Sequence, residues 1–130
     1  MPHVETPFHP SLGDVDSVGV IFHARLFDAA QRGLERFLEE RGFPITRLCT
    51  EGPRTPIVRA EAEFRLAIRL GDRLVIASSA AEVGVASFRM KHLFLRPDGY
   101  EAARVEVVHV AIDAQGRSIP LPADFRAAIE

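Results

Sequence analysis

The sequence has one cysteine, one lysine and no asparagine among its 130 residues. Because Cys49 is alone, the chain forms no internal disulfide and builds no thiolate metal site. Without asparagine there is no N-glycosylation sequon. The N-terminus has no signal-peptide pattern, and no apolar run approaches the ~18–20 residues of a membrane span. We therefore expect a cytoplasmic protein without a membrane partner.

An excess of charge of one sign is also missing. The 16 basic and 18 acidic residues leave a net charge of −2. A surface that follows a nucleic-acid backbone usually needs a basic excess or stripe, so we expect no nucleic-acid partner. Lys91 is the only lysine, and nearly all positive charge is therefore guanidinium, which suits bidentate phosphate contacts. A codon or thermal-adaptation bias is the alternative explanation.

Length and composition favour one globular domain spanning residues 1–130. The chain is 47% hydrophobic and 26% charged, as is typical of folded domains with a core. A chain of this length is nevertheless short for enclosing a large ligand alone. The short length of the chain therefore points to an oligomer whose sites lie between subunits.

The clearest predicted element is an amphipathic helix from Phe22 to Arg41. Its apolar residues recur at spacings of three and four, which places them on one face. Gly42 followed by Pro44 is a plausible stop signal. Gly33 costs about 1 kcal/mol relative to alanine in mid-helix, so we expect a sheet or a second helix to approach closely there. The apolar face consists of Phe27, Ala30, Leu34, Phe37 and Leu38.

Strand patterns dominate the rest of the chain. Alternating apolar and polar residues predict strands over about residues 57–70, 74–83, 85–95 and 100–112. The first dozen residues form at most a broken edge strand, and a short helix closes the chain from Ala123. Short turns between consecutive strands predict an antiparallel sheet and hence a two-layer α+β domain. Its open face and edges would need cover, which again suggests self-association.

The segment from Gly13 to Arg25 is the most informative. It places Asp14 and Asp16 before a glycine, an apolar triplet and a histidine at the expected helix start. A carboxylate beside the N–H groups of a helix N-terminus is the geometry that acyl transfer needs. The alternative is that both aspartates only cap a helix or shape a turn. An EF-hand calcium loop is excluded, because its twelfth position counted from Asp14 holds Arg25 rather than glutamate.

The pattern Asp14-x-Asp16-x-x-Gly19-apolar-apolar-Phe22-His23 resembles the hotdog-fold thioesterases, specifically the 4-hydroxybenzoyl-CoA thioesterase group. The likeness continues in a strand that ends at a Gly-Asp pair and in a Pro-containing tail, and covers roughly residues 8–128. This resemblance implies a hotdog fold, in which an antiparallel sheet of five to six strands wraps around one long central helix.

The resemblance also implies roles for individual residues. Asp16 takes the place of the catalytic carboxylate and either attacks the thioester carbonyl or activates a water, two routes that the sequence does not separate. The backbone N–H of His23 would polarise the thioester oxygen; whether its imidazole also contributes stays open. Gly19 and Phe22 are assigned to substrate binding, and Asp14 is expected to order the loop.

Arg89 and Lys91 share one face of a strand that runs near the pantetheine and phosphate path in relatives. They are the predicted contacts of the substrate's phosphates, although a solvated strand face is the alternative. His109 is expected to be a core or interface histidine. No residues have metal-ligand spacing, and the resemblance implies no cofactor, since coenzyme A is part of the substrate.

The function implied is hydrolysis of an acyl-CoA thioester, including aromatic esters similar to 4-hydroxybenzoyl-CoA, by a homodimer or homotetramer with shared sites. One alternative is a thioesterase that acts on acyl chains carried by an acyl carrier protein. Another is a non-catalytic acyl-CoA-binding protein. Asp16 and Gly19 argue against the latter, because a carboxylate beside a bound thioester would only add a desolvation cost.

Overall fold

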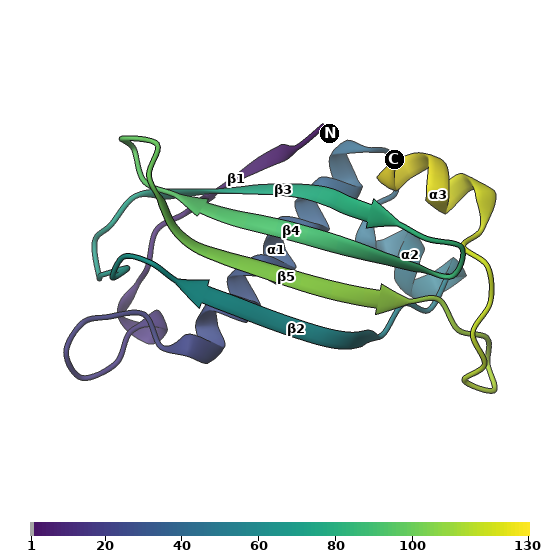
Figure 1. The fold of residues 1–130 in the computed structure, drawn as a ribbon, viewed down its shortest axis with the longest axis horizontal. Helices are drawn as coiled ribbons and strands as arrows, with labels where there is room; N and C mark the ends of the chain where they lie inside the picture. The colour runs from purple at the N-terminus through teal and green to yellow at the C-terminus, as the bar shows by residue number, and fades with distance from the viewer. Residues whose placement is uncertain (1) are drawn as a thin grey trace.

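A five-stranded antiparallel sheet and one long helix make up most of the structure (Figure 1). The computed structural model describes residues 2–130. The strands lie in the order β1-β3-β4-β5-β2, so that β1 and β2 form the two edges. The predicted α+β hotdog fold is thereby confirmed. In chain order the elements are β1 (Val4–Phe8), η1 (Leu12–Asp14), α1 (His23–Glu40), α2 (Ile45–Glu51), β2 (Ile57–Phe64), β3 (Leu74–Val83), β4 (Ser87–Leu95), β5 (Glu101–Val110) and α3 (Ala123–Ile129).

Helix α1 lies across one face of the sheet and ends where the sequence indicates. Gly42 adopts a φ of 80° just beyond its last residue. The N–H of Phe43 donates to the carbonyl of Leu38 at 2.8 Å, which completes a left-handed glycine cap. The stop signal is confirmed, and the predicted helix is one residue too long at each end. The residues that α1 buries are Leu26, Ala29, Ala30, Gly33, Leu34, Phe37 and Leu38.

Gly33 lies where α1 comes closest to the sheet. A Cβ atom placed on this glycine would lie 2.5 Å from Oγ of Ser78 on β3 and 3.2 Å from Nδ1 of His92 on β4. These two side chains are buried and hydrogen-bonded to each other, with 2.7 Å between Oγ and Nδ1. The close approach expected from the sequence is therefore confirmed, and the sheet is the neighbour.

The strand predicted over residues 57–70 is wrong in its second half, because β2 ends at Phe64. The next two backbone N–H groups both donate to the carbonyl of Ala102, at 2.9 and 3.0 Å, and the chain bends away from β5. Residues 68–70 pair instead with residues 19–21. The alternation of side chains continues across this change of partner, so a period of two does not reveal it.

Two short helices complete the chain. The sequence did not predict α2, a helix of seven residues of which none is fully buried, although Leu48 packs against the core. Helix α3 begins at Ala123 as predicted and buries Phe125 and Ile129. Among the described residues, no helix combines the length and apolar character that crossing a bilayer requires.

The sheet has one covered face and one open face. Figure 1 views it from the open side, with α1 behind the strands. Along β4, buried side chains alternate with partly exposed ones. The covered face contributes Met90 and Phe94, both fully buried. The open face carries Arg89, Lys91 and, on β5, Glu106. No element of residues 2–130 covers this face.

Gly33→Ala is expected to destabilise the fold, although alanine is the better helix former by about 1 kcal/mol. The added methyl group would lie 2.5 Å from Oγ of Ser78, and overpacking of this kind costs about 1–3 kcal/mol. The urea midpoint should therefore fall with little change in slope. In a Ser78→Ala background the loss should be smaller, because the obstructing oxygen is absent. Equal losses in both backgrounds would contradict the contact. Gly13→Ala, where nothing lies within 4 Å, is the control.

His92 is expected to make stability depend on pH below neutrality. Burial, assisted by the nearby charge of His109, lowers the pKa of His92 from 6.5 to about 3. Between these values the unfolded chain binds a proton that the folded chain does not. Stability is thus fully present above pH 6.5 and falls as the pH drops towards 3, by up to ~1.4 kcal/mol per pH unit. Urea unfolding at a series of pH values measures this slope. His92→Gln should flatten it, whereas an unchanged slope would assign the acid sensitivity to other groups.

Candidate active site

Residues 14–22 form a tight hairpin immediately before α1. Val15 and Ile21 face each other in an antiparallel bridge. At its base the N–H of Phe22 donates to the carbonyl of Asp14 at 2.9 Å. The segment that was expected to be a loop is therefore an ordered hairpin. It joins the two aspartates of the motif to the start of the helix.

Asp16 and Gly19 shape the tip of the hairpin. Oδ1 of Asp16 accepts hydrogen bonds from the N–H groups of Val18 and Val20, at 3.0 and 3.1 Å. The N–H of Gly19 donates to the carbonyl of Asp16 at 3.1 Å, and Gly19 adopts a φ of 78° that favours glycine. Asp16 is exposed, and its Oδ2 has no hydrogen-bond partner in the described part of the chain. One carboxylate oxygen therefore holds the turn while the other faces solvent.

Asp14 has a different role. Its Oδ2 accepts hydrogen bonds from the N–H and the hydroxyl of Ser11, at 2.9 and 3.0 Å. Its main-chain carbonyl closes the base of the hairpin. Both contacts are structural, which agrees with the expectation that Asp14 orders the loop.

The N-terminus of α1 is open beside this hairpin. The first N–H groups of a helix have no intrahelical acceptor. The N–H of Arg25 donates to the carbonyl of Phe22 at 2.8 Å, whereas within residues 2–130 those of His23 and Ala24 have no recorded acceptor. Phe22, the N-cap residue, provides no side-chain cap. The positive end of the helix dipole is thus free to meet a negative group.

Exposed apolar residues lie on the segments that adjoin this end of α1. Phe22 is 47% exposed, and its ring packs against the imidazole of His23, with 4.6 Å between the ring centroids. The neighbouring segment adds Leu66 and Leu70, and the N–H of Leu70 donates to the carbonyl of Gly19 at 3.0 Å. Leu12 and Val18 complete the set. Such an apolar rim suits an apolar acyl group or a second subunit.

These parts define what the site can do. A free carboxylate oxygen can attack a carbonyl carbon or take a proton from water. Backbone N–H groups at a helix N-terminus can stabilise the oxyanion that forms. The structure therefore brings Asp16, Gly19, Phe22 and His23 together in one hairpin and helix start.

Arg89 and Lys91 lie away from this hairpin within one chain. Figure 1 shows the hairpin at the end of the sheet towards which β4 runs, and Arg89 is six residues before the last residue of that strand, Leu95. At about 3.3 Å per residue, this separation is about 20 Å. Arg89 also pairs with Glu106 at 2.9 Å and with Glu82 at 3.3 Å.

His109 has the surroundings expected of a core histidine. Its ring stacks on Phe88 at 4.7 Å, and Nδ1 lies 3.0 Å from the carbonyl oxygen of Thr55. Burial lowers its pKa. The ring therefore lies buried between the strands and the loop before β2, where its neutral form is favoured.

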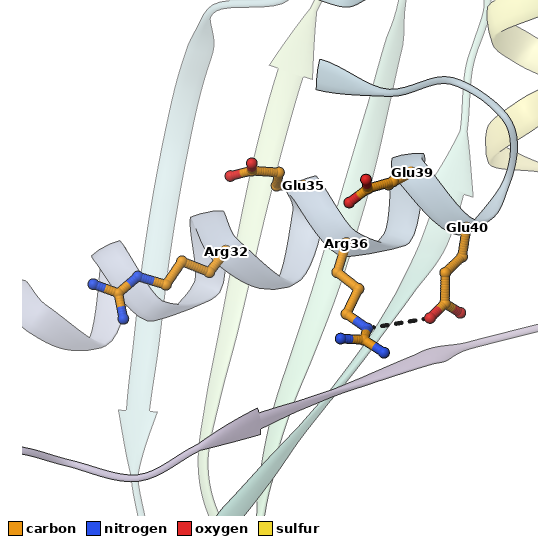
Figure 2. A pocket seen from close by; sticks show the side chains of 5 residues that line it. All are labelled: Arg32, Glu35, Arg36, Glu39 and Glu40. Carbon is orange, nitrogen blue, oxygen red and sulfur yellow. Dashed lines mark hydrogen bonds and ion pairs between the residues drawn. The ribbon is translucent and has the colours of Figure 1, made fainter. Parts of the chain in front are cut away.

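A separate hollow of about 440 Å³ follows the solvent face of α1 (Figure 2). All of its lining side chains are charged, and Arg36 pairs with Glu40 at 3.1 Å. Such pairs are typical of an exposed helix surface, and we assign it no chemistry. Across residues 2–130, no three His, Cys, Asp or Glu side chains are grouped as metal ligands. The hollow is lined by Arg32, Glu35, Arg36, Glu39 and Glu40.

Sequence reasoning missed one component of the site, the segment at residues 68–70. The N–H of Ile21 donates to the carbonyl of Ile68 at 2.8 Å, and Val20 forms a bridge with Arg69. This segment supports the hairpin from outside. The Gly-Asp turn that follows it was visible in the sequence, but the partner was not, because the pairing joins segments almost 50 residues apart.

Residues 10–129 match the family model of the Thioesterase-like superfamily. The 1,4-dihydroxy-2-naphthoyl-CoA hydrolase of Prochlorococcus marinus strain MIT 9515 is 30% identical over 125 residues, which cover 91% of this chain and 83% of the hydrolase. The crystal structure of a 1,4-dihydroxy-2-naphthoyl-CoA thioesterase from Synechocystis is 21% identical with a TM-score of 0.89, covering 98% of this chain and 96% of that one. A 4-hydroxybenzoyl-CoA thioesterase mutant, complexed with 4-hydroxybenzoyl-CoA, is 22% identical with a TM-score of 0.86, covering 98% and 99%.

The chain belongs to the Thioesterase-like superfamily. The resemblance read from the hairpin motif is confirmed, and so is the enzyme class, a thioester hydrolase of the acyl-CoA type. The named relatives act on CoA esters of different aromatic acids.

Proposed function

We propose that this thioesterase hydrolyses the CoA ester of an aromatic acid, with Asp16 as the reacting carboxylate. The observation that carries the proposal is the position of Asp16 in a hairpin joined directly to the open N-terminus of α1. The apolar rim around Phe22 suits an aromatic acyl group. The relatives are named after CoA esters of hydroxylated aromatic acids, and these names support the same substrate class.

In the proposed reaction the thioester oxygen accepts hydrogen bonds from the N–H groups of His23 and Ala24. In one route, Asp16 takes a proton from water as the water oxygen bonds to the acyl carbon. In the other, Oδ2 of Asp16 bonds to that carbon, and water later hydrolyses the resulting anhydride. In both routes the C–S bond breaks, the sulfur keeps the electron pair, and the free CoA thiol forms after protonation.

The other residues of the motif have supporting roles in this proposal. Gly19 permits the positive-φ turn that aims Asp16 outward. Phe22 contacts the acyl group, and the imidazole of His23 borders the same space. We assign no cofactor or metal to the reaction, since the carboxylate and the helix N–H groups provide both functions that thioester hydrolysis requires.

We further propose that the working enzyme is at least a homodimer formed along β2. In the described part of the chain this edge strand has no partner on its outer side, and an open edge invites pairing with another strand. Val58 and Phe64 are 60% and 51% exposed on it. A second copy paired there would cover these side chains and extend the sheet across both chains. A tetramer that also covers the charged sheet face stays a prediction.

Asp16→Asn is the direct test of the proposed role. The amide keeps an oxygen that can accept the N–H groups of Val18 and Val20, so the hairpin should fold, while the negative charge is lost. We expect kcat to fall ~10²–10⁴-fold with little change in the urea midpoint. Asp28→Asn is the matched control, because Asp28 is an exposed carboxylate on α1 that pairs with Arg25. Wild-type turnover by Asp16→Asn would remove the assigned role.

The same assay, run with EDTA present, identifies the substrate class. Aromatic and straight-chain CoA esters are compared with the same acyl groups on a carrier protein. The proposal expects the highest kcat/KM with aromatic CoA esters. Faster hydrolysis of the carrier-bound esters would favour the carrier-protein alternative, and binding of acyl-CoA without thiol release would favour a binding protein.

Val58→Lys is expected to yield an inactive monomer. A lysine here would place a charge on the edge that must pair, which opposes strand addition. Sedimentation velocity measures the oligomeric state, and hydrolysis is assayed on the same sample. Val85→Lys is the control, since Val85 is equally apolar and 73% exposed but lies in the turn between β3 and β4. A monomeric variant with full activity would show that one chain is sufficient.

A further inference from the structure

A hollow of about 440 Å³ lies on the outer side of the turn that leads into β3. Three arginines are among the residues that line it, Arg69, Arg73 and Arg96. Asp72 is the one acidic residue that lines it. Its Oδ2 accepts the main-chain N–H of Arg69 at 2.8 Å and so holds the turn.

The positive charge at this hollow is only partly neutralised. Arg96 pairs with Asp98 at 3.3 Å, at positions where both side chains are 46% exposed. Neither Arg69 nor Arg73 forms an ion pair with any carboxylate of residues 2–130. Even when both aspartates are counted, positive charge remains in excess. An anion is therefore the ligand that this hollow favours.

The hollow lies beside the candidate active site. Arg69 forms a backbone bridge with Val20 of the hairpin that carries Asp16. Arg73 immediately precedes β3 and Arg96 immediately follows β4, and these strands are paired at this end, with Val75 opposite Leu95. All three arginines thus belong to the sheet end at which the hairpin lies.

We propose that Arg69, Arg73 and Arg96 bind phosphate groups of the nucleotide part of the CoA substrate; this inference rests on the proposed function. Guanidinium groups bind phosphate oxygens through paired, charge-assisted hydrogen bonds. A hollow of this volume accommodates part of a nucleotide. The thioester end of the same molecule would extend towards Asp16 and the start of α1.

The proposal differs from the sequence-based assignment of phosphate contacts to Arg89 and Lys91. Arg89 is held by two carboxylates, Glu82 and Glu106, and a phosphate would have to displace them. Arg69 and Arg73 form no ion pair within residues 2–130 that a phosphate would have to displace. Within one chain they are also nearer the hairpin than Arg89, which lies about 20 Å back along β4.

The test compares two substrates that share one acyl group: the CoA thioester and its N-acetylcysteamine analogue, which has no phosphate. The readout is the ratio of kcat/KM for the CoA ester to that for the analogue. We expect Arg69→Gln and Arg73→Gln each to lower this ratio about tenfold. Arg32→Gln is the matched control, because it removes one exposed arginine on the solvent face of α1 (Figure 2) and should leave the ratio unchanged.

Two outcomes would overturn the inference while the proposed function stands. One is an unchanged ratio in Arg69→Gln and Arg73→Gln. The other is a tenfold loss in Lys91→Gln or Arg89→Gln instead, which would place the phosphates on the open sheet face. If wild type hydrolyses neither ester, the proposed function fails. Calorimetry with adenosine 3′,5′-bisphosphate then still tests the hollow: binding that Arg69→Gln weakens about tenfold supports it, and no binding to wild type refutes it.

Discussion

The contact of α1 with the sheet at Gly33 is the constraint on which the rest of the structure depends. Gly33 lies over the hydrogen-bonded pair of Ser78 and His92, and this polar pair separates two apolar clusters. One cluster packs the first half of the helix and the other its second half. Because an α-helix rises about 1.5 Å per residue and is stiff, its height above the sheet at Gly33 sets the position of its N-terminus about 15 Å away. The fixed helix start is what the hairpin and the candidate site are built against.

The hairpin shows how the two roles that the sequence left open for Asp16, a turn-forming role and the proposed reactive role, can coexist in one residue. Asp16 does the first with Oδ1, which accepts two backbone N–H groups, and keeps Oδ2 free for the second. Fixing one oxygen limits the rotation of the carboxylate, so the other oxygen is oriented before substrate arrives. Such preorganisation lowers the entropy cost of reaching the reactive geometry. The interpretation of Asp16 as a turn-forming residue and its interpretation as a reactive residue are therefore compatible.

Much of the fold could be predicted from the sequence because it depends on local patterns. The helix face, the glycine cap at Gly42 and the strand alternation are each properties of neighbouring residues. The close approach at Gly33 was predictable as well, since mid-helix glycine has a cost that needs a reason. The early end of β2, the support of the hairpin by residues 68–70 and the cluster of Arg69, Arg73 and Arg96 were not. They depend on contacts between distant segments, which no local period encodes.

The edge strand β2 shows what a chain of this short length leaves uncovered. Within one chain, the carboxylate, the open helix N-terminus and the arginine hollow all lie at one end of the sheet. What one chain does not supply is cover for the apolar side chains of Val58 and Phe64, nor a second wall for the rim around Phe22. If a partner provides both, each chain supplies its own carboxylate and helix N-terminus, but the acyl group is bound only where two chains meet, and a monomer is therefore inactive. Substitutions at the interface would then change substrate range without altering Asp16, and relatives with different aromatic substrates would share one hairpin.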